Sequence, residues 1–381
     1  YASFELRIAM ILADEMDADW SHVVAELAPA ADVYKDPVFG LQMVGGSASI
    51  PNSFQQYREL GAKTRAMLIA TAAERWRVPA ERCHTSNSVV TGPANQSARY
   101  ADLASDAARR PIPDTVRLKT PSEFRLIGTR VRRLDSRAKC DGSQKFGLDL
   151  DLPGMRTALL ARPPVFGARV KTMDDADARS VAGVQDVFEI PLVRGSAVAV
   201  VADTFWSAKQ ARDRLKVEWD LSGLERAGQF AAVDAVQVAG SGRRKDCRPT
   251  RQRPDPRIRF RRRIGSSPSL SFPISLTRAM EPLNATVRFD GDHAEAWVPS
   301  QAQTLDQVAV AEVLGLKPDQ VTFHTEYAGG GFGRRTPLDS HIPREAAAVA
   351  KRMQWRAHQA GVDARGRRAG RLLSADVRAS R

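Results

Sequence analysis

Apolar positions in the first eighty residues recur at helical spacing in two places. Residues 6–19 place an apolar face ahead of an acidic end, and residues 57–76 carry Leu, Ala, Met and Ile about one turn apart. We predict a helix in each stretch. Between them, residues 22–27 have the short apolar–polar alternation of a strand, and a loop with prolines and glycines leads to Gly45-Gly46-Ser47.

A second patterned stretch lies between residues 285 and 325. Two alternating runs, 285–289 and 294–298, flank Asp290-Gly291-Asp292, which predicts a β-hairpin. Residues 304–316 have the pattern of an amphipathic helix that ends near a glycine and a proline. Residues 321–325 alternate as a strand, which leads directly into a glycine-rich loop.

The middle of the chain has a different pattern. Residues 145–220 alternate short strands with helices and predict a separate small α/β domain. Residues 105–137 are rich in proline and arginine and have the composition of a linker. The patterned stretches on either side share an order of helix, acidic turn, strand and glycine loop, namely 12–47 and 311–333. This order indicates an internal repeat or a chance similarity.

Composition narrows the classes of protein. No run approaches 18 consecutive apolar residues, so the sequence predicts no transmembrane helix. Cys83, Cys140 and Cys247 are far apart and odd in number, which excludes a disulfide framework and a clustered zinc or iron–sulfur site. The six histidines include no pair at metal-ligand spacing, so we predict no metal-binding side chains.

The net charge of +13 is unevenly distributed. Residues 243–278 carry 12 basic and 2 acidic side chains, and residues 351–381 carry 9 basic and 2 acidic ones. The remaining chain is therefore mildly acidic. A nucleic-acid-binding module needs positive charge on a folded face with interleaved aromatic residues. Here the charge lies in segments with few aromatic residues, which argues against nucleic acid as a partner.

The glycine loop, Gly329-Gly330-Gly331-Phe332-Gly333-Arg334-Arg335, is the clearest candidate for chemistry. Consecutive glycines let the backbone approach a ligand without a Cβ between them, and their N–H groups form a concave anion site. We expect both arginines to be available for an oxyanion and Phe332 to form an apolar wall. The spacing matches neither a Walker loop nor a dinucleotide fingerprint. An ordinary turn is the alternative, and the position after a strand favours the functional loop.

The loop, together with Pro299-Ser300-Gln301-Ala302-Gln303, resembles the molybdopterin-binding subunits of the xanthine dehydrogenase/aldehyde oxidase family. In that family the glutamine matching Gln301 hydrogen-bonds the apical oxo group of molybdenum, and the glycine loop lies against the metal centre. The arginine after Gly333, together with Met280-Glu-Pro-Leu-Asn284, is most similar to the isoquinoline 1-oxidoreductase beta-subunit branch. The resemblance also implies that Gly45, Gly46 and Ser47 lie near the pterin or its nucleotide phosphates.

The resemblance implies an α+β fold in which molybdenum-cofactor-binding α/β units flank a small α/β hammerhead domain. It divides the chain into six parts: an N-terminal molybdopterin-binding segment (1–104), a linker (105–137), the hammerhead domain (138–220), an irregular basic segment (221–278), a partial molybdopterin-binding domain (279–352) and a basic tail (353–381). The cofactor-binding residues it implies are Gln301, Gly329, Gly330, Gly331, Phe332, Gly333 and Arg334, with Gly45, Gly46 and Ser47.

The two basic segments depart from the family pattern, which continues after the glycine loop with acidic and aromatic residues. Back-translated with GC-rich codons and shifted by one base, residues 360–380 give such a continuation. Residues 272–278, shifted by two bases, give the run that normally precedes Met280. We hypothesise that roughly 238–278 and 353–381 are out-of-frame translations that do not pack as the family's elements do. An intact frame on resequencing would contradict this and leave a disordered basic tail.

An intact relative binds molybdenum as molybdopterin cytosine dinucleotide and oxidises an N-heteroaromatic or aldehyde substrate with water as oxygen donor. It passes electrons to a small [2Fe-2S] subunit and is commonly periplasmic, failing which we expect the cytoplasm. The family's catalytic base is a glutamate beyond the last residue here, so we expect no catalytic and no metal-ligating residue. The alternatives are an inactive truncated or frameshifted product that retains the fold only in part and, in another class, a basic nucleic-acid-binding protein.

Overall fold

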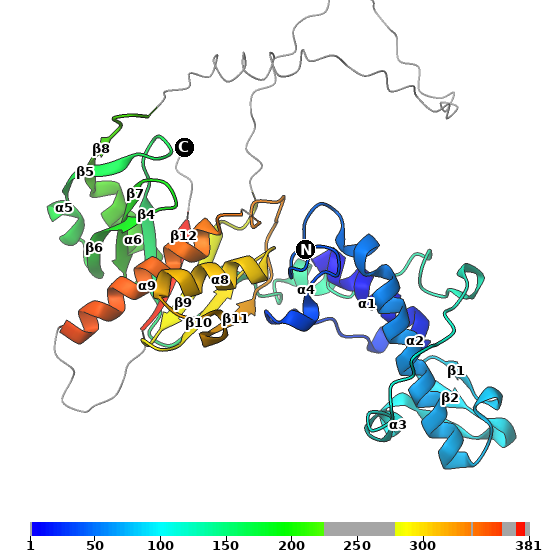
Figure 1. The fold of residues 1–381 in the computed structure, drawn as a ribbon. Helices are drawn as coiled ribbons and strands as arrows, with labels where there is room; N and C mark the ends of the chain where they lie inside the picture. The colour runs from blue at the N-terminus through cyan, green and yellow to red at the C-terminus, as the bar shows by residue number, and fades with distance from the viewer. Residues whose placement is uncertain (1, 225–278, 337, 360–370, 378–381) are drawn as a thin grey trace, which may run out of the picture.

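The computed structural model describes residues 2–224, 279–336, 338–359 and 371–377, which form a mixed α and β structure (Figure 1). The predicted basic segment from 221 to 278 lies outside the described residues, apart from 221–224. Among the described helices, none is long and apolar enough to cross a membrane.

A seven-stranded mixed sheet forms the larger core. Its strand order is β11-β10-β9-β12-β4-β7-β6. The pairs β10–β11 and β12–β4 are parallel, and the other four are antiparallel. The strands are β4 (Arg156–Ala161), β6 (Val184–Pro191), β7 (Ser196–Ala202), β9 (Leu283–Phe289), β10 (Ala294–Val298), β11 (Val321–Thr325) and β12 (Arg371–Val377).

Two helices, α8 (Gln303–Leu314) and α9 (His341–Gln359), lie over one face of this sheet (Figure 1). Val310 and Leu314 of α8 join a buried cluster with Val287 of β9 and Phe323 of β11. The predicted hairpin, helix and strand of residues 285–325 are therefore confirmed. The end of α8 also follows the prediction, because Gly315 takes a left-handed conformation and donates its N–H to the Ala311 carbonyl at 2.9 Å.

The small α/β region is joined to the larger core and does not form a sheet entirely its own. Its strands β4, β6 and β7 belong to the seven-stranded sheet, and only β5 (Arg169–Asp174) and β8 (Lys216–Asp220) pair separately. Helices α5 (Ala176–Arg179) and α6 (Phe205–Arg214) pack against the strands β4, β6 and β7 of the larger sheet. The expectation of a separate domain is wrong in this respect, because β12 pairs with β9 on one side and β4 on the other.

Strand β12 also corrects the prediction for the basic tail. Residues 353–359 continue α9, and the backbone of residues 371–377 pairs with two strands near the middle of the sheet. The segment contains neither proline nor glycine over seven residues, so its backbone supplies an uninterrupted row of N–H and C=O groups. Part of the predicted basic tail is thus ordered as a helix end and a strand, while the hypothesis that the tail is an out-of-frame translation stays a prediction.

The N-terminal region packs α1 (Ala2–Met16) against the long α2 (Ser49–Trp76). The helices approach closely at Gly61, where an added Cβ would lie 2.7 Å from the Leu12 carbonyl oxygen. Helix α2 begins eight residues before the predicted 57, because Pro51 falls in its first turn, where a missing N–H costs no hydrogen bond. The smaller elements are α3 (Tyr100–Ala107), α4 (Ser136–Asp141), β1 (His84–Ser86), β2 (Val89–Thr91) and β3 (Ser97–Arg99).

Single-turn 3₁₀ helices connect these elements: Trp20–His22, Asp32–Tyr34, Ala80–Arg82, Pro93–Asn95, Pro121–Glu123, Gly147–Asp149 and Pro318–Gln320. The strand predicted at 22–27 is absent from the described structure. Val24 is 78% exposed, and the alternation of a strand has no ladder to join here. The first copy of the predicted internal repeat, residues 12–47, therefore lacks the strand that the second copy has.

Residues 28–44 nevertheless lie alongside the larger core. The carbonyl of Ala28 accepts a hydrogen bond from Thr325 Oγ1 at 3.1 Å, and Ala30 N–H donates to the Phe323 carbonyl at 3.4 Å. Gln42 N–H donates to Thr304 Oγ1 at 3.0 Å, at the start of α8. These bonds bring the N-terminal loop to the edge of the sheet where the glycine loop begins.

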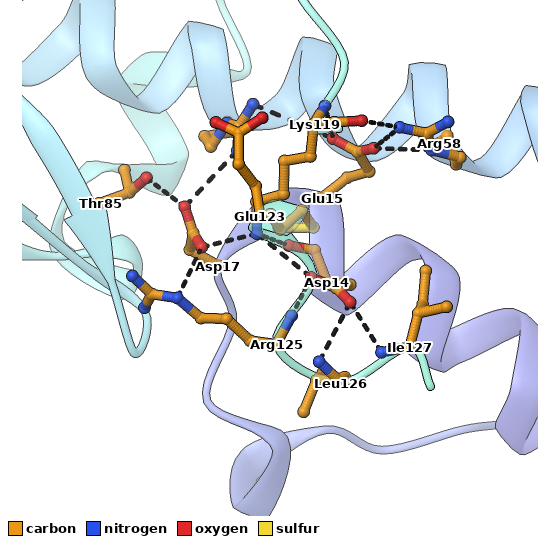
Figure 2. Close-up of polar contacts among 12 residues, drawn as sticks. Asp14, Glu15, Asp17, Arg58, Thr85, Lys119, Glu123, Arg125, Leu126 and Ile127 are labelled. Carbon is orange, nitrogen blue, oxygen red and sulfur yellow. Dashed lines mark hydrogen bonds and ion pairs between the residues drawn. The ribbon is translucent and has the colours of Figure 1, made fainter. Parts of the chain in front are cut away.

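Part of the stretch predicted as a linker is fastened to the N-terminal helices by buried charges (Figure 2). The Asp14 carboxylate, at the end of α1, accepts the backbone N–H groups of residues 125, 126 and 127. Lys119 is 7% exposed and pairs with Asp14 at 3.2 Å and Asp17 at 2.7 Å. Arg58 of α2 pairs with the fully buried Glu15 at 2.6 Å. Residues 119–127 are thus a clamp across α1 and α2.

Candidate cofactor site

The glycine loop leaves β11 and turns sharply. Gly330 and Gly333 have φ values of 109° and 74°, and Phe332 between them has a φ of 51°. These values lie in the left-handed region, which a glycine adopts without strain. Arg334 N–H closes the turn on the Gly331 carbonyl at 2.8 Å. The loop is therefore a defined turn closed by a backbone hydrogen bond, a geometry that both an ordinary turn and a cofactor loop can have.

A single buried carboxylate, that of Glu281, anchors this loop. Its Oε2 accepts the Gly329 N–H at 2.7 Å and Arg335 Nη2 at 2.8 Å. Its Oε1 accepts the Leu148 N–H at 2.9 Å and Asn284 Nδ2 at 3.0 Å. Its backbone N–H donates to the Gly329 carbonyl at 2.9 Å. One side chain thus connects the loop to the start of β9 and to the small α/β region.

The two arginines of the loop have opposite roles. The Arg335 side chain is 3% exposed and is committed to Glu281, while its Nε donates to the Gly330 carbonyl at 2.9 Å. The expectation that Arg335 is available for an oxyanion is therefore wrong, because a buried guanidinium needs a buried counter-ion. Arg334 is exposed on the surface of the loop, and Phe332 is 69% exposed beside it.

Gln301 lies against the glycine loop, as the resemblance requires. A Cβ added to Gly331 would lie 2.8 Å from Gln301 Oε1, so the glycine is what admits the amide. The backbone N–H of Gln301 donates to the Arg335 carbonyl at 3.0 Å. Its Oε1 is buried and accepts no hydrogen bond from the part of the chain that the structure describes. Leaving such an atom unpaired costs about 1–3 kcal/mol, so the geometry favours a ligand here.

The predicted N-terminal glycines lie next to Gln301. Val44 N–H donates to the Gln301 carbonyl at 2.7 Å, and Gln301 Nε2 donates back to the Val44 carbonyl at 3.2 Å. Gly46 and Ser47 then form a left-handed turn with φ values of 59° and 57°, and α2 begins two residues later. The structure therefore bonds Val44, the residue before the predicted glycines, to the same glutamine whose amide faces Gly331.

A cavity of about 240 Å³ extends from Val44 between α1, α2 and the loop of residues 25–43. Polar groups line it, and among them Gln303 Oε1 is buried without a partner within the described residues. The other polar side chains along it are those of Glu26, Tyr34, Asp36, Gln42, Ser49, Ser53 and Tyr57. Burial raises the pKa of Tyr57 above its ordinary value. The cavity thus continues the site away from the glycine loop.

Side chains of the described residues form no group of three His, Cys, Asp or Glu that could hold a metal. Glu326 follows directly after β11, where the chain enters the loop, and its carboxyl feels the charge of Glu281. Burial, and secondarily the Glu281 carboxylate, raises the pKa of Glu326 above its ordinary value. The site accordingly favours a ligand bound through backbone N–H groups and amides.

Comparison with known proteins gives the family. The molybdopterin cofactor-binding domain matches residues 269–358. The beta subunit of isoquinoline 1-oxidoreductase from Brevundimonas diminuta is 31% identical in an alignment of 375 positions, gaps included, that covers 85% of this chain and 47% of that protein. The chain belongs to the molybdopterin-binding oxidoreductase family. The Gln301 and glycine-loop positions fall inside the matched domain.

Two further relatives of this molybdopterin-binding chain are more distant. A membrane-bound aldehyde dehydrogenase (pyrroloquinoline-quinone) of Gluconacetobacter polyoxogenes is 28% identical and covers 90% of this chain and 45% of its own length. Quinoline 2-oxidoreductase from Pseudomonas putida 86 is 17% identical, with a TM-score of 0.40 over 66% of this chain and 34% of its own. The chain spans less than half the length of the curated relatives it matches.

Sequence reasoning missed three groups in the site of this family member. In the sequence, Glu281 stands out only as part of the run Met280–Asn284. An acidic residue directly before an apolar strand is the local signal that marks it. Val44 carries the contact that the adjacent glycines were expected to make. Ser300 and Asp306, next to Gln301 in the sequence and in α8, gave no local signal because both have ordinary helix-start character.

Proposed function

We propose that this chain holds molybdopterin cytosine dinucleotide in a molybdenum hydroxylase. The observation that carries the proposal is the buried Oε1 of Gln301, which faces Gly331 without a partner among the described residues. A backbone loop held rigid by Glu281 and Arg335 surrounds it. The residues therefore fit a polar cofactor that reaches the glycine loop.

Within this proposal, Gln301 and the loop orient the metal end of the cofactor. Gln301 Nε2 has two hydrogens, one of which is donated to the Val44 carbonyl, so the other would be available to donate to an oxo group of the cofactor. The unpaired Oε1 would accept an N–H of the cofactor. Phe332, 69% exposed beside the turn, would offer the bound cofactor an apolar surface. When bound, the cofactor supplies the molybdenum centre at which the substrate loses two electrons and gains oxygen from water.

The cavity beyond Val44 is our proposed place for the nucleotide arm. It is lined by hydroxyl and amide groups and by the carboxylates of Glu26 and Asp36, and it opens beside the start of a 28-residue helix. Backbone N–H groups at the start of a helix favour phosphate. Gly46 and Ser47 form the turn ahead of that helix. Gln303 Oε1 is an acceptor for the amino group that distinguishes cytosine from uracil.

Substrate and partner follow from the relatives rather than from the geometry. One relative is named for isoquinoline and another for aldehydes, and both substrate classes suit the proposed chemistry. The first is a beta subunit, so we propose a small [2Fe-2S] subunit as electron acceptor. We further propose a periplasmic location, which fractionation of the native host would test.

The test is cofactor content after expression in a host that makes molybdopterin cytosine dinucleotide. We expect molybdenum near one atom per chain by mass spectrometry, and CMP on acid hydrolysis. Gly331→Ala, whose methyl group meets Gln301 Oε1, should lose most of the molybdenum. Gly128→Ala meets no atom but strains a backbone with a φ of 83°, so it controls for a loss of stability alone and should keep the molybdenum. A wild-type chain without molybdenum, or with a quinone in its place, would refute the proposal and favour an inactive product.

A further inference from the structure

Asp306 is a buried acid that belongs to α8 but bonds outside it. Its side chain lies in the first turn of the helix with the residue 3% exposed, and its Oδ2 accepts the Ser300 hydroxyl at 2.5 Å. An acid placed only to complement a helix dipole remains effective at the surface. Burial raises the pKa of Asp306 to about 6, the cost of keeping it inside. This cost indicates a specific task for the carboxyl.

The Ser300 hydroxyl also binds on the other side of Gln301. Its Oγ accepts the backbone N–H of Ala302 at 2.9 Å, so one hydroxyl joins the residue before Gln301 to the residue after it. Asp306 fixes the rotation of that hydroxyl by accepting its hydrogen bond. The short turn that aims the Gln301 side chain is thereby closed by Ser300 and locked from behind by Asp306.

The same acid faces the anchor of the glycine loop. Asp306 borders a cavity of about 20 Å³ whose lining includes Asn284, Arg334 and Arg335. Arg335, in turn, accepts the Gln301 backbone N–H through its carbonyl. Asp306 therefore lies between the turn that carries Gln301 and the residues that hold the loop.

We propose that Asp306 and Ser300 are positioning residues that hold the Gln301 amide toward the glycine loop. The proposal rests on the proposed function for its purpose, although the positioning itself is a property of the chain alone. Neither side chain is a catalytic residue. Their effect is exerted through the orientation of Gln301.

The experiment observes Gln301 directly in the full chain without cofactor. Glutamine-selective ¹⁵N labelling gives a side-chain amide signal for Gln301, assigned by its loss in Gln301→Ala. Gln307, also on α8, donates to the Val321 carbonyl at 2.9 Å and serves as the internal control signal. We compare Ser300→Ala, Asp306→Leu, Asp306→Asn and the Ser300→Ala/Asp306→Leu double variant.

We expect Ser300→Ala and Asp306→Leu to shift the Gln301 signal and speed its hydrogen exchange about tenfold, while the Gln307 signal stays in place. The double variant should be no worse than either single one, because the two residues act as a unit. Asp306→Asn keeps an acceptor for Ser300 and should restore the wild-type signal. An unmoved Gln301 signal in Asp306→Leu, or equal movement of Gln307, would overturn the proposal.

Molybdenum content of the same variants gives the functional readout. We expect Asp306→Leu and Ser300→Ala to retain less molybdenum per chain than Asp306→Asn. If the wild-type chain takes up none, the proposed function fails while the amide signals still decide the positioning. If the amide signals move but all variants retain the same amount of molybdenum, this pair positions Gln301 without any effect on cofactor binding. That result would overturn the proposed role of the pair in holding the cofactor.

Discussion

Replacing Arg335 with methionine tests whether the glycine loop depends on its buried ion pair. The Arg335 and Glu281 side chains are 3% and 6% exposed, with 2.8 Å between Nη2 and Oε2. Removing one partner of such a pair leaves a buried charge, which costs about 3–5 kcal/mol. Arg335→Met should therefore raise the unfolding equilibrium constant by roughly 10² to 10⁴.

The neighbouring Arg334 provides the matched control, because it is exposed. Arg334→Met makes the same chemical change and should alter stability by no more than about 0.5 kcal/mol. Urea unfolding of the chain without cofactor gives both values, and hydrogen exchange at the Gly329 and Glu281 amides, which bond to each other's segments, localises the loss. Equal unfolding midpoints for the two variants would refute the assignment of Arg335 to the loop anchor.

Three further predictions concern stability. Lys119→Met removes the lysine partner of Asp14 and Asp17, whose side chains are 0% and 9% exposed, and should lower the free energy of unfolding in urea by about 3–5 kcal/mol. Arg117→Met removes an arginine that is 70% exposed and paired with Glu123, and should lower it by at most about 1 kcal/mol. Similar losses in the two variants would contradict the clamp. The pKa of Asp306 is raised from 3.8 to about 6, so the folded state binds the extra proton and stability should fall as pH rises from about 4 to about 6, by on the order of 3 kcal/mol. Asp306→Asn should remove that slope in pH-dependent unfolding, and an unchanged slope would assign it elsewhere. Gly61→Ala should destabilise the chain by about 1–3 kcal/mol despite alanine's better helix propensity, because its Cβ meets the Leu12 carbonyl; a higher thermal midpoint would show that the helices can separate without cost.

Local patterns predicted the elements whose stability is local. The hairpin of β9 and β10, the glycine-capped α8 and the strand β11 all lie within two residues of their predicted bounds. The strand predicted at 22–27 is wrong because alternation specifies which side chains share a face and does not supply a partner strand. The chain reaches the core just after this segment, through single hydrogen bonds of residues 28 and 30.

The site was predictable in its residue types but not in its pairings. Gln301 does lie against the glycine loop and is bonded to Val44, next to the predicted residues 45–47. The sequence could not show that Arg335 is paired with Glu281, since that pair spans 54 positions. It also could not show that β12 joins two regions into one sheet. Both facts depend on contacts between distant segments, which neither spacing nor composition encodes.

The two-way bond between Val44 and Gln301 has a consequence for how the protein is made. These residues are 257 positions apart in the sequence, and the hydrogen bond from Thr325 Oγ1 to the Ala28 carbonyl joins residues 297 positions apart. At about 5–20 residues per second, the ribosome needs on the order of 10–60 s to supply the second half of each bond. During that interval the loop carrying Val24, Val33 and Val38, each more than two-thirds exposed even in the finished fold, waits without its partner strand. The bond between Val44 and Gln301 therefore cannot form until residue 301 has left the ribosome.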